Sequence, residues 1–243
     1  MIPYLSLFNN MNFSSKKNIV FLILSGFFIT NAVVAELIGG KLIQIGPFAL
    51  SIGIIPWPVV FLATDLINEF YGKKAVKKLT ILTSSLIGYA FLILLVAMFT
   101  RAASFSPVQD AQFDAVFGQS MWIIVGSITA FVVSQLVDVF VFWFLREKTG
   151  GRMIWLRSTG STAISQLIDT FIVGGIAFWL PGKIAFQEYI NMSGTGYVAK
   201  LIIAILLTPL IYFGHFLIDK YFGEKHSHDL IEAVAEKNTE HTK

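Results

Sequence analysis

The chain has 243 residues, of which 55% are hydrophobic and only 14% are charged. Soluble domains carry about 25% charged residues, so this composition excludes an ordinary soluble protein and indicates a single polytopic membrane domain. The absence of cysteine excludes disulfide bonds and thiolate metal sites, and a net charge of +3 does not by itself point to a nucleic-acid partner.

The first apolar run covers 18–37 and contains Asn31 and Glu36. The lysines before it and its apolar core also fit a signal peptide, but Asn31 and the later runs favour a retained helix. Glu36, near the outer end, is expected to reach the interface. Residues 39–53 are too interrupted by glycine and proline to span a membrane, so we expect an outer loop or a short hairpin there.

Five more apolar runs follow, at 54–71, 79–100, 120–145, 158–180 and 196–218. Each run has about 18 to 26 residues, which is enough to cross about 30 Å of hydrocarbon with some tilt. The polar stretches 101–119 and 183–195 are expected to be loops, and the polar tail has room for a short helix. The fold class is therefore an all-α membrane protein with six transmembrane helices.

The distribution of positive charge predicts the orientation of these six spans. Fourteen of the 18 lysines and arginines fall on the side of both termini, and the other four are Lys41, Arg101, Lys183 and Lys200. Because cytoplasmic loops are enriched in lysine and arginine, both termini are expected in the cytoplasm. The chain then divides into a cytoplasmic N-terminal segment (1–18), a six-helix transmembrane domain (19–221) and a polar cytoplasmic tail (222–243).

A five-residue word, Ser-Gln-Leu-aliphatic-Asp, occurs twice, at 134–138 and at 165–169. On a helix, residues three apart share a face, so each word presents a carboxamide and a carboxylate together. At about 1.5 Å of rise per residue, Gln135 falls level with Asp169, and Asp138 falls level with Gln166. We therefore expect two antiparallel helices that face each other across a central site, as in transporters built from inverted repeats.

Other polar residues share this depth. Asp65 lies about 12 Å from the cytoplasmic rim on the second run. No lysine or arginine is expected at this level, so the carboxylates must be protonated, hydrated, bonded to one another or available to a ligand. Glu69 is expected instead to form a surface pair with Lys73, four residues on. Buried carboxylates of this kind mark a transport pathway, whereas a lone glutamine is equally well explained as a contact between helices.

Missing motifs exclude several enzyme classes. The chain has no G-x-x-x-x-G-K-S/T phosphate loop, no H-E-x-x-H zinc motif and no G-x-S-x-G nucleophile elbow. We therefore expect no enzyme activity, no cofactor and no metal. An intramembrane enzyme or a structural scaffold stays open as a different class, in which polar substitutions would change turnover or assembly rather than uptake.

Three blocks resemble those of the queuosine-precursor transporters, also described as vitamin-uptake-like transporters. The blocks are FLATDLINEFYGKK at 61–74, SQLVDVFVF at 134–142 and STAISQLIDTF at 161–171. The resemblance implies an inner-membrane carrier, similar in fold to the substrate-binding subunits of energy-coupling-factor transporters, that imports a 7-deazaguanine such as 7-cyano-7-deazaguanine. The substrate-binding residues that it implies are Asn31, Asp65, Asn68, Gln135, Asp138, Gln166 and Asp169, with Glu69 as a further member of the first block.

The chemistry of these residues suits such a substrate. A guanine-like edge has adjacent N–H and NH₂ donors beside a carbonyl, so a carboxylate can accept from both donors while a carboxamide donates to the carbonyl. Phe61 is the candidate ring for stacking. Three questions stay open: whether a buried carboxylate couples uptake to protons, whether the chain assembles as a homo-oligomer, and whether it is instead a binding subunit for another planar vitamin that needs separate ATPase chains.

Overall fold

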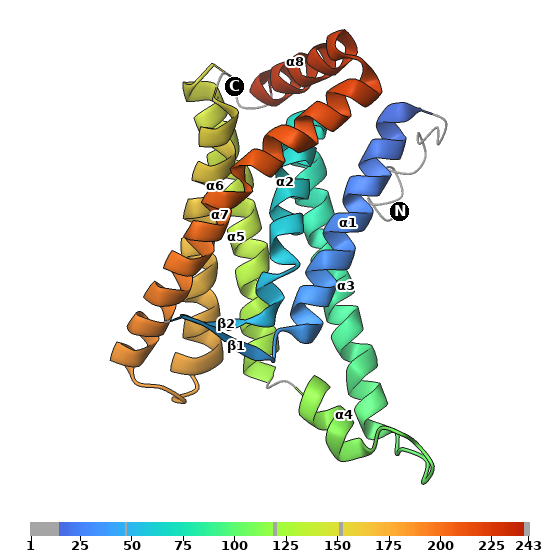
Figure 1. The fold of residues 1–243 in the computed structure, drawn as a ribbon, viewed down its shortest axis with the longest axis vertical. Coiled ribbons are helices and arrows are strands. Elements are labelled where there is room, and N and C mark those ends of the chain that lie inside the picture. The colour runs from blue at the N-terminus through green and yellow to red at the C-terminus, as the bar shows by residue number, and fades with distance from the viewer. Residues whose placement is uncertain (1–14, 47, 119–120, 151–152, 241–243) are drawn as a thin grey trace.

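A computed structural model describes residues 15–46, 48–118, 121–150 and 153–240 (Figure 1). The long helices run along the long axis of an elongated bundle, and α8 lies across one end of it. Most of the predicted N-terminal segment, at 1–14, and the last residues of the tail, at 241–243, lie outside the described residues.

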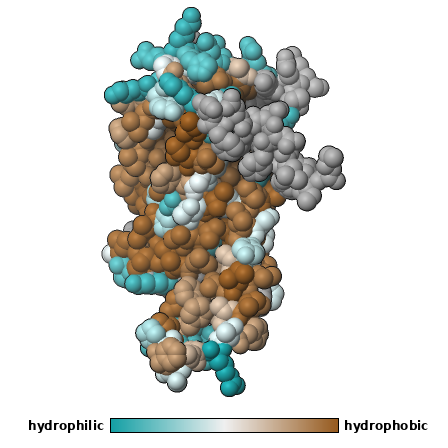
Figure 2. Space-filling view, turned by 90° about the vertical axis from the view of Figure 1, so that its right-hand side faces the viewer, coloured by the Kyte–Doolittle hydropathy of each residue, from teal (hydrophilic) through white to brown (hydrophobic). Residues whose placement is uncertain are grey.

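Within the described ranges, six segments are long and apolar enough to cross a membrane, which confirms the predicted number of spans. Their main helices are α1 (Lys16–Ile38), α2 (Trp57–Tyr71), α3 (Lys73–Phe99), α5 (Met121–Lys148), α6 (Ile154–Gly174) and α7 (Phe186–Phe222). The chain is therefore a multi-pass membrane protein. On the face that Figure 2 shows, a broad hydrophobic band crosses the middle of the molecule, and hydrophilic residues gather towards its two ends.

Glycine and proline set the bounds of α2. Pro58 lies in its first turn, where a missing backbone N–H breaks no helical hydrogen bond. Gly72 follows its last residue with a φ of +85°, a conformation that glycine adopts without a Cβ clash. Helix α3 then starts at Lys73 in a new direction, so the face of α2 does not continue into it.

The stretch at 39–53 forms the short hairpin that was one of the two predictions. Strand β1 (Leu42–Ile45) pairs antiparallel with β2 (Phe48–Ser51), and a 3₁₀ turn (Ile52–Ile54) leads into α2. The Ser51 hydroxyl donates to the Gly39 carbonyl at 2.7 Å and holds the hairpin against the end of α1.

Two stretches predicted to be loops contain helix. Helix α4 (Asp110–Phe117) lies within 101–119, and its first turn is capped because the Gln109 backbone N–H donates to the Gln112 side chain at 2.9 Å. Helix α7 begins at Phe186 instead of near 196, and the Ala185 backbone N–H donates to Glu188 at 3.1 Å. The polarity of these residues misled the prediction because it reflects exposure to water beyond the membrane and does not exclude a helix.

The tail is part of the bundle rather than a separate polar segment. After Gly223 it forms α8 (Glu224–Glu240). Val234 is buried in the main hydrophobic core, while Leu230 and Ile231 pack against the cluster that contains Phe70 and Phe222. One face of α8 therefore closes the end of the bundle at which α2 stops.

Candidate functional site

The two repeated words, one on α5 and the other on α6, face each other as predicted. The Ser134 hydroxyl of the first word donates to Oδ1 of Asp169 in the second at 3.4 Å. The Ser165 hydroxyl of the second word donates to Oδ1 of Asp138 in the first at 3.1 Å. This crossed exchange confirms that the words lie at matching depth on antiparallel helices, and it is made by the serines rather than by the glutamines.

Asp65 adds a third helix to the layer of polar side chains that contains Asp138 and Asp169. It is buried on α2, and the Ser158 hydroxyl of α6 donates to its Oδ2. Ser158 was not predicted as a site residue, although the sequence offers a signal for it. The run Ser-Thr-Gly-Ser-Thr at 158–162 concentrates hydroxyl groups that need partners within an apolar helix.

The prediction that no lysine or arginine shares this level is wrong. Lys200 Nζ lies 2.7 Å from Asp169 Oδ2. The reason is the early start of α7, because Lys200 lies 14 residues after Phe186, about 21 Å along the helix, rather than at its outer end. The layer therefore contains three carboxylates from α2, α5 and α6 and an ammonium group from α7.

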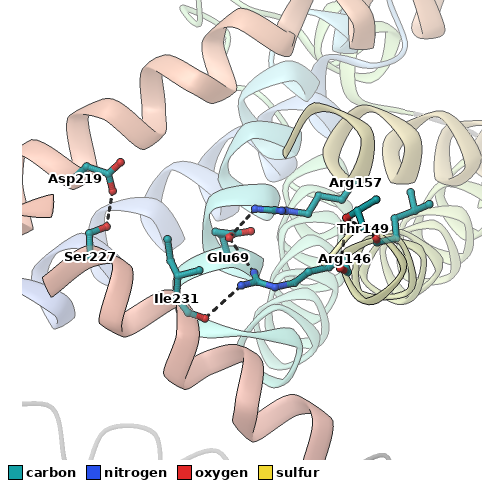
Figure 3. A network of polar contacts seen from close by, with 8 residues as sticks. Glu69, Arg146, Thr149, Arg157, Asp219, Ser227 and Ile231 are labelled. Atoms are coloured by element: carbon teal, nitrogen blue, oxygen red, sulfur yellow. Dashed lines mark hydrogen bonds and ion pairs between the residues drawn. The ribbon is translucent and has the colours of Figure 1, made fainter. Parts of the chain in front are cut away.

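Glu69 does not form the predicted surface pair with Lys73. Its side chain is 2% exposed, and its Oε1 lies 2.9 Å from Arg146 Nη1 and 2.7 Å from Arg157 Nη2 (Figure 3). The i,i+4 rule holds only within one helix, and the break at Gly72 separates Glu69 from Lys73. Glu69 instead joins α2 to α5 and α6 by a buried ion cluster.

The remaining predicted residues occupy different surroundings. Asn68 is buried, and its Oδ1 accepts from Trp143 Nε1 at 3.4 Å. Gln135 is buried on α5, and its Oε1 accepts no hydrogen bond from residues in the described part of the chain. Gln166 is buried at one side of the layer. Asn31 is only half-buried and donates to the Phe27 carbonyl of its own helix at 2.8 Å, so the fold does not join it to the other six.

Glu36 extends the polar set beyond the prediction. It is buried rather than directed to the interface, and it accepts a hydrogen bond from the Ser127 hydroxyl of α5. The predicted position near the end of α1 was correct, but the facing helix α5 supplies a hydrogen-bond partner for this carboxyl group within the bundle.

Two small hollows open beside the layer, and each has a volume of about 10 Å³. One is lined by Asp65 and Ser158 and the other by Gln166 and Lys200, while Phe61 lines both. A space of that size holds about one water molecule. A bicyclic ligand can therefore reach these side chains only if the helices around Phe61 move apart.

A larger hollow, of about 470 Å³, lies away from this layer between the end of α3 and α4. Gln109, Asp110 and Asp114 supply its polar lining. It contains none of the predicted substrate-binding residues. Its exposed position among the polar residues before α5 makes it a surface groove rather than part of the intramembrane site.

Comparisons with known proteins agree on one family. The family model described as "Putative vitamin uptake transporter" matches residues 51–214. A "Probable queuosine precursor transporter" of Bacillus subtilis is 31% identical over 174 residues, which cover 71% of this chain and 74% of that protein. A protein of the same description from Haemophilus influenzae is 28% identical over 159 residues, covering 64% and 63% of the two chains.

The "Queuosine precursor transporter" of Escherichia coli is 26% identical over 169 residues, which cover 68% of this chain and 72% of that protein. No solved structure matches. All three relatives are named as transporters and none as an enzyme, which supports the expectation of a non-enzymatic protein.

Proposed function

The chain belongs to the vitamin uptake transporter family, and from this premise we propose that it imports queuosine precursors, namely 7-deazaguanines such as 7-cyano-7-deazaguanine, across the inner membrane. The observation that carries the proposal is the crossed exchange between Ser134 and Asp169 and between Ser165 and Asp138. It holds two carboxylates, one on each of two antiparallel helices, at the centre of the bundle.

The substrate would replace hydroxyl donors at these carboxylates. A serine hydroxyl gives a carboxylate one donor, whereas the N–H and NH₂ of a guanine-like edge give it two in parallel. Asp138 and Asp65 are both buried, and each is bonded to a serine hydroxyl of α6. An analogue that lacks these donors would leave a buried carboxylate without its partners, which is a strong basis for rejecting it.

Access to the site requires movement of helices. The hollows at the layer are too small for a bicyclic base, and Phe61, stacked on Trp57 with ring centroids 5.9 Å apart, lines both of them. Displacement of this ring would open the hollows and offer a flat surface to the substrate. Phe61 is thus the proposed stacking partner.

We include proton coupling in the proposal. Asp65 and Asp138 are both buried, and each accepts a hydrogen bond from a serine hydroxyl of α6, so a proton on one of them would lower the cost of keeping two carboxylates within the bundle. Uptake by proteoliposomes should then follow an imposed pH gradient and stop with a protonophore. Uptake that requires added ATPase and scaffold chains would instead support the binding-subunit alternative.

The test of the site replaces Asp138 by asparagine. Asp138→Asn removes one carboxylate acceptor and adds a donor that faces the substrate's own donors, so uptake should fall at least a hundredfold. Uptake is measured as queuosine in the tRNA of cells that cannot make the precursor and are supplied with it externally. Asp114→Asn, at an exposed position on α4, is the matched control and should transport normally. Normal modification in cells carrying Asp138→Asn would remove Asp138 from the site.

A further inference from the structure

Lys200 is the cation of the layer, and its position there was not predicted from the sequence. Its Nζ lies 2.7 Å from Asp169 Oδ2, and the two side chains are 26% and 13% exposed. It lines the second of the two small hollows, together with Gln166, Trp57 and Phe61. Lys200 therefore lies at the boundary of the space that a ligand would enter, and Asp169 is held next to it by the ion pair.

The three carboxylates of the layer have different partners. Asp65 and Asp138 each accept from a serine hydroxyl, whereas Asp169 is paired with a cation. Its serine contact, from Ser134, is longer at 3.4 Å. An ammonium group within a bundle that spans the membrane is costly even when paired, and ion pairs of this kind rarely add net stability over apolar packing. A contribution to the contact between α6 and α7 therefore does not account for Lys200, and its position indicates a further role.

The Lys200–Asp169 pair presents a donor beside an acceptor. Lysine has three donors and no acceptor, so it can keep one hydrogen on Asp169 and direct another into the hollow. A guanine-like edge has the complementary order, with the amino group and ring N–H next to a carbonyl. Asp169 can accept from the ring N–H and one amino hydrogen while Lys200 donates to the carbonyl oxygen, which leaves the second amino hydrogen for Asp138. Gln166 lies beside them, and its carboxamide can serve as either donor or acceptor.

We propose that Lys200 is a specificity-determining residue that recognises the ring carbonyl of the substrate. This inference rests on the proposed function and adds a residue and a chemical criterion to it. The transporter should select a 2-amino-6-oxo ring over its 2,6-diamino analogue, because the analogue directs amino hydrogens at the ammonium group and also lacks the ring N–H that donates to Asp169. A charged hydrogen bond of this kind is worth about tenfold to a hundredfold in affinity.

The experiment compares two ligands on the same protein samples. Binding isotherms are recorded for 7-deazaguanine and for 2,6-diamino-7-deazapurine with the purified full chain in lipid nanodiscs. The wild type should prefer 7-deazaguanine by about tenfold to a hundredfold. Lys200→Gln should lower this preference by about tenfold, because its carboxamide can turn either a donor or an acceptor to the ligand, while the part of the preference that comes from the ring N–H at Asp169 remains. Lys200→Arg, which has only donors, should keep the preference.

The preference is a ratio of two affinities measured on one sample, so it does not depend on the fraction of active protein. Lys41→Gln, at an exposed lysine on the same end of the molecule as the hairpin, is the matched control and should behave as the wild type. Equal affinities of the wild type for the two ligands would overturn the proposal, as would an unchanged preference in Lys200→Gln. If the wild type binds neither ligand, the proposed function itself fails.

Discussion

At the scale of single residues, the ion cluster around Glu69 joins three charged side chains that are all buried. One carboxylate lies between two arginines, and Arg146 also donates to the Ile231 carbonyl of α8 at 3.3 Å (Figure 3). The Arg146 guanidinium lies 5.0 Å from the centre of the Trp143 ring. The cluster therefore ties α2, α5, α6 and α8 together at the end of the bundle that α8 covers.

Removal of the shared carboxylate should destabilise the protein. Glu69→Gln removes the carboxylate that two buried guanidinium groups share, which costs on the order of 3–5 kcal/mol. Thermal unfolding in detergent should show a clearly lower midpoint. Glu147→Gln, at the exposed position next to Arg146, should change stability by less than about 0.5 kcal/mol. Arg157→Met should recover part of the loss in the Glu69→Gln background, and an unaltered midpoint for Glu69→Gln would show that the cluster does not stabilise the fold.

The crossed serine contacts should be unequal in strength. Ser165→Ala removes a 3.1 Å hydrogen bond from the buried carboxylate of Asp138, whereas Ser134→Ala removes a 3.4 Å bond from Asp169, which retains Lys200. Ser165→Ala should therefore lower stability by about 1–3 kcal/mol, and Ser134→Ala by less. Ser85→Ala, whose hydroxyl bonds within its own helix at an exposed position, is the control in the same unfolding assay. The reverse order of the two effects would contradict this view of the layer.

At the scale of elements, two helix ends decide the chemistry of the centre. The end of α2 at Gly72 turns Glu69 inward to the arginines, and the start of α7 at Phe186 places Lys200 in the layer. The first turns of α7 are held against α6, because the Tyr189 hydroxyl donates to the Phe171 carbonyl at 3.0 Å. Gly174 permits this approach, since a Cβ there would lie 2.7 Å from Ser193 Oγ.

Helix α8 should be required for stability through its buried face. Val234→Asp places a charge at a position that is 9% exposed in the main core, while Ala233→Asp makes the same change at an exposed neighbour. The first substitution should lower the unfolding midpoint and the amount of protein in the membrane, because an unpaired buried carboxylate costs several kcal/mol. The second should leave both unchanged. Equal behaviour of the two variants would mean that the tail does not close the bundle in the membrane.

At the scale of the whole molecule, positive charge gathers at the end that α8 covers. The lysines that begin α3 lie there, next to the α2 end that α8 contacts, and Lys220 and Lys225 flank the junction of α7 with α8. The opposite end contains the β1–β2 hairpin and α4. This distribution is the one on which the prediction of cytoplasmic termini depends.

Reporter fusions test that orientation. Green fluorescent protein joined to the C-terminus should fluoresce, and alkaline phosphatase joined at the same point should be inactive, because the first folds in the cytoplasm and the second does not. Phosphatase inserted after Gly182, in the turn between η3 (Gly175–Trp179) and α7, should be active. The opposite pattern of activities would place α8 outside and reverse the predicted direction of the layer.

Much of the fold could be predicted from local patterns. The number of spans depends on the length of apolar runs, and the facing of 134–138 and 165–169 follows from helical rise on two antiparallel segments. Asp65, Asp138 and Asp169 were expected in one layer for the same reason. Asn31 was expected there too, yet its side chain bonds to its own helix, since a carboxamide can satisfy itself on the preceding turn without any partner helix.

The sequence by itself determined a six-span membrane protein with carboxylates at mid-membrane, because burial in hydrocarbon restricts composition residue by residue. Only the tertiary structure decided which cation meets which carboxylate. Lys200 and Asp169 are 31 residues apart, and Glu69 and Arg157 are 88 apart. Their contacts depend on where α2 ends and α7 begins, and a shift of one or two turns moves a side chain by about 5–11 Å, beyond the reach of an ion pair.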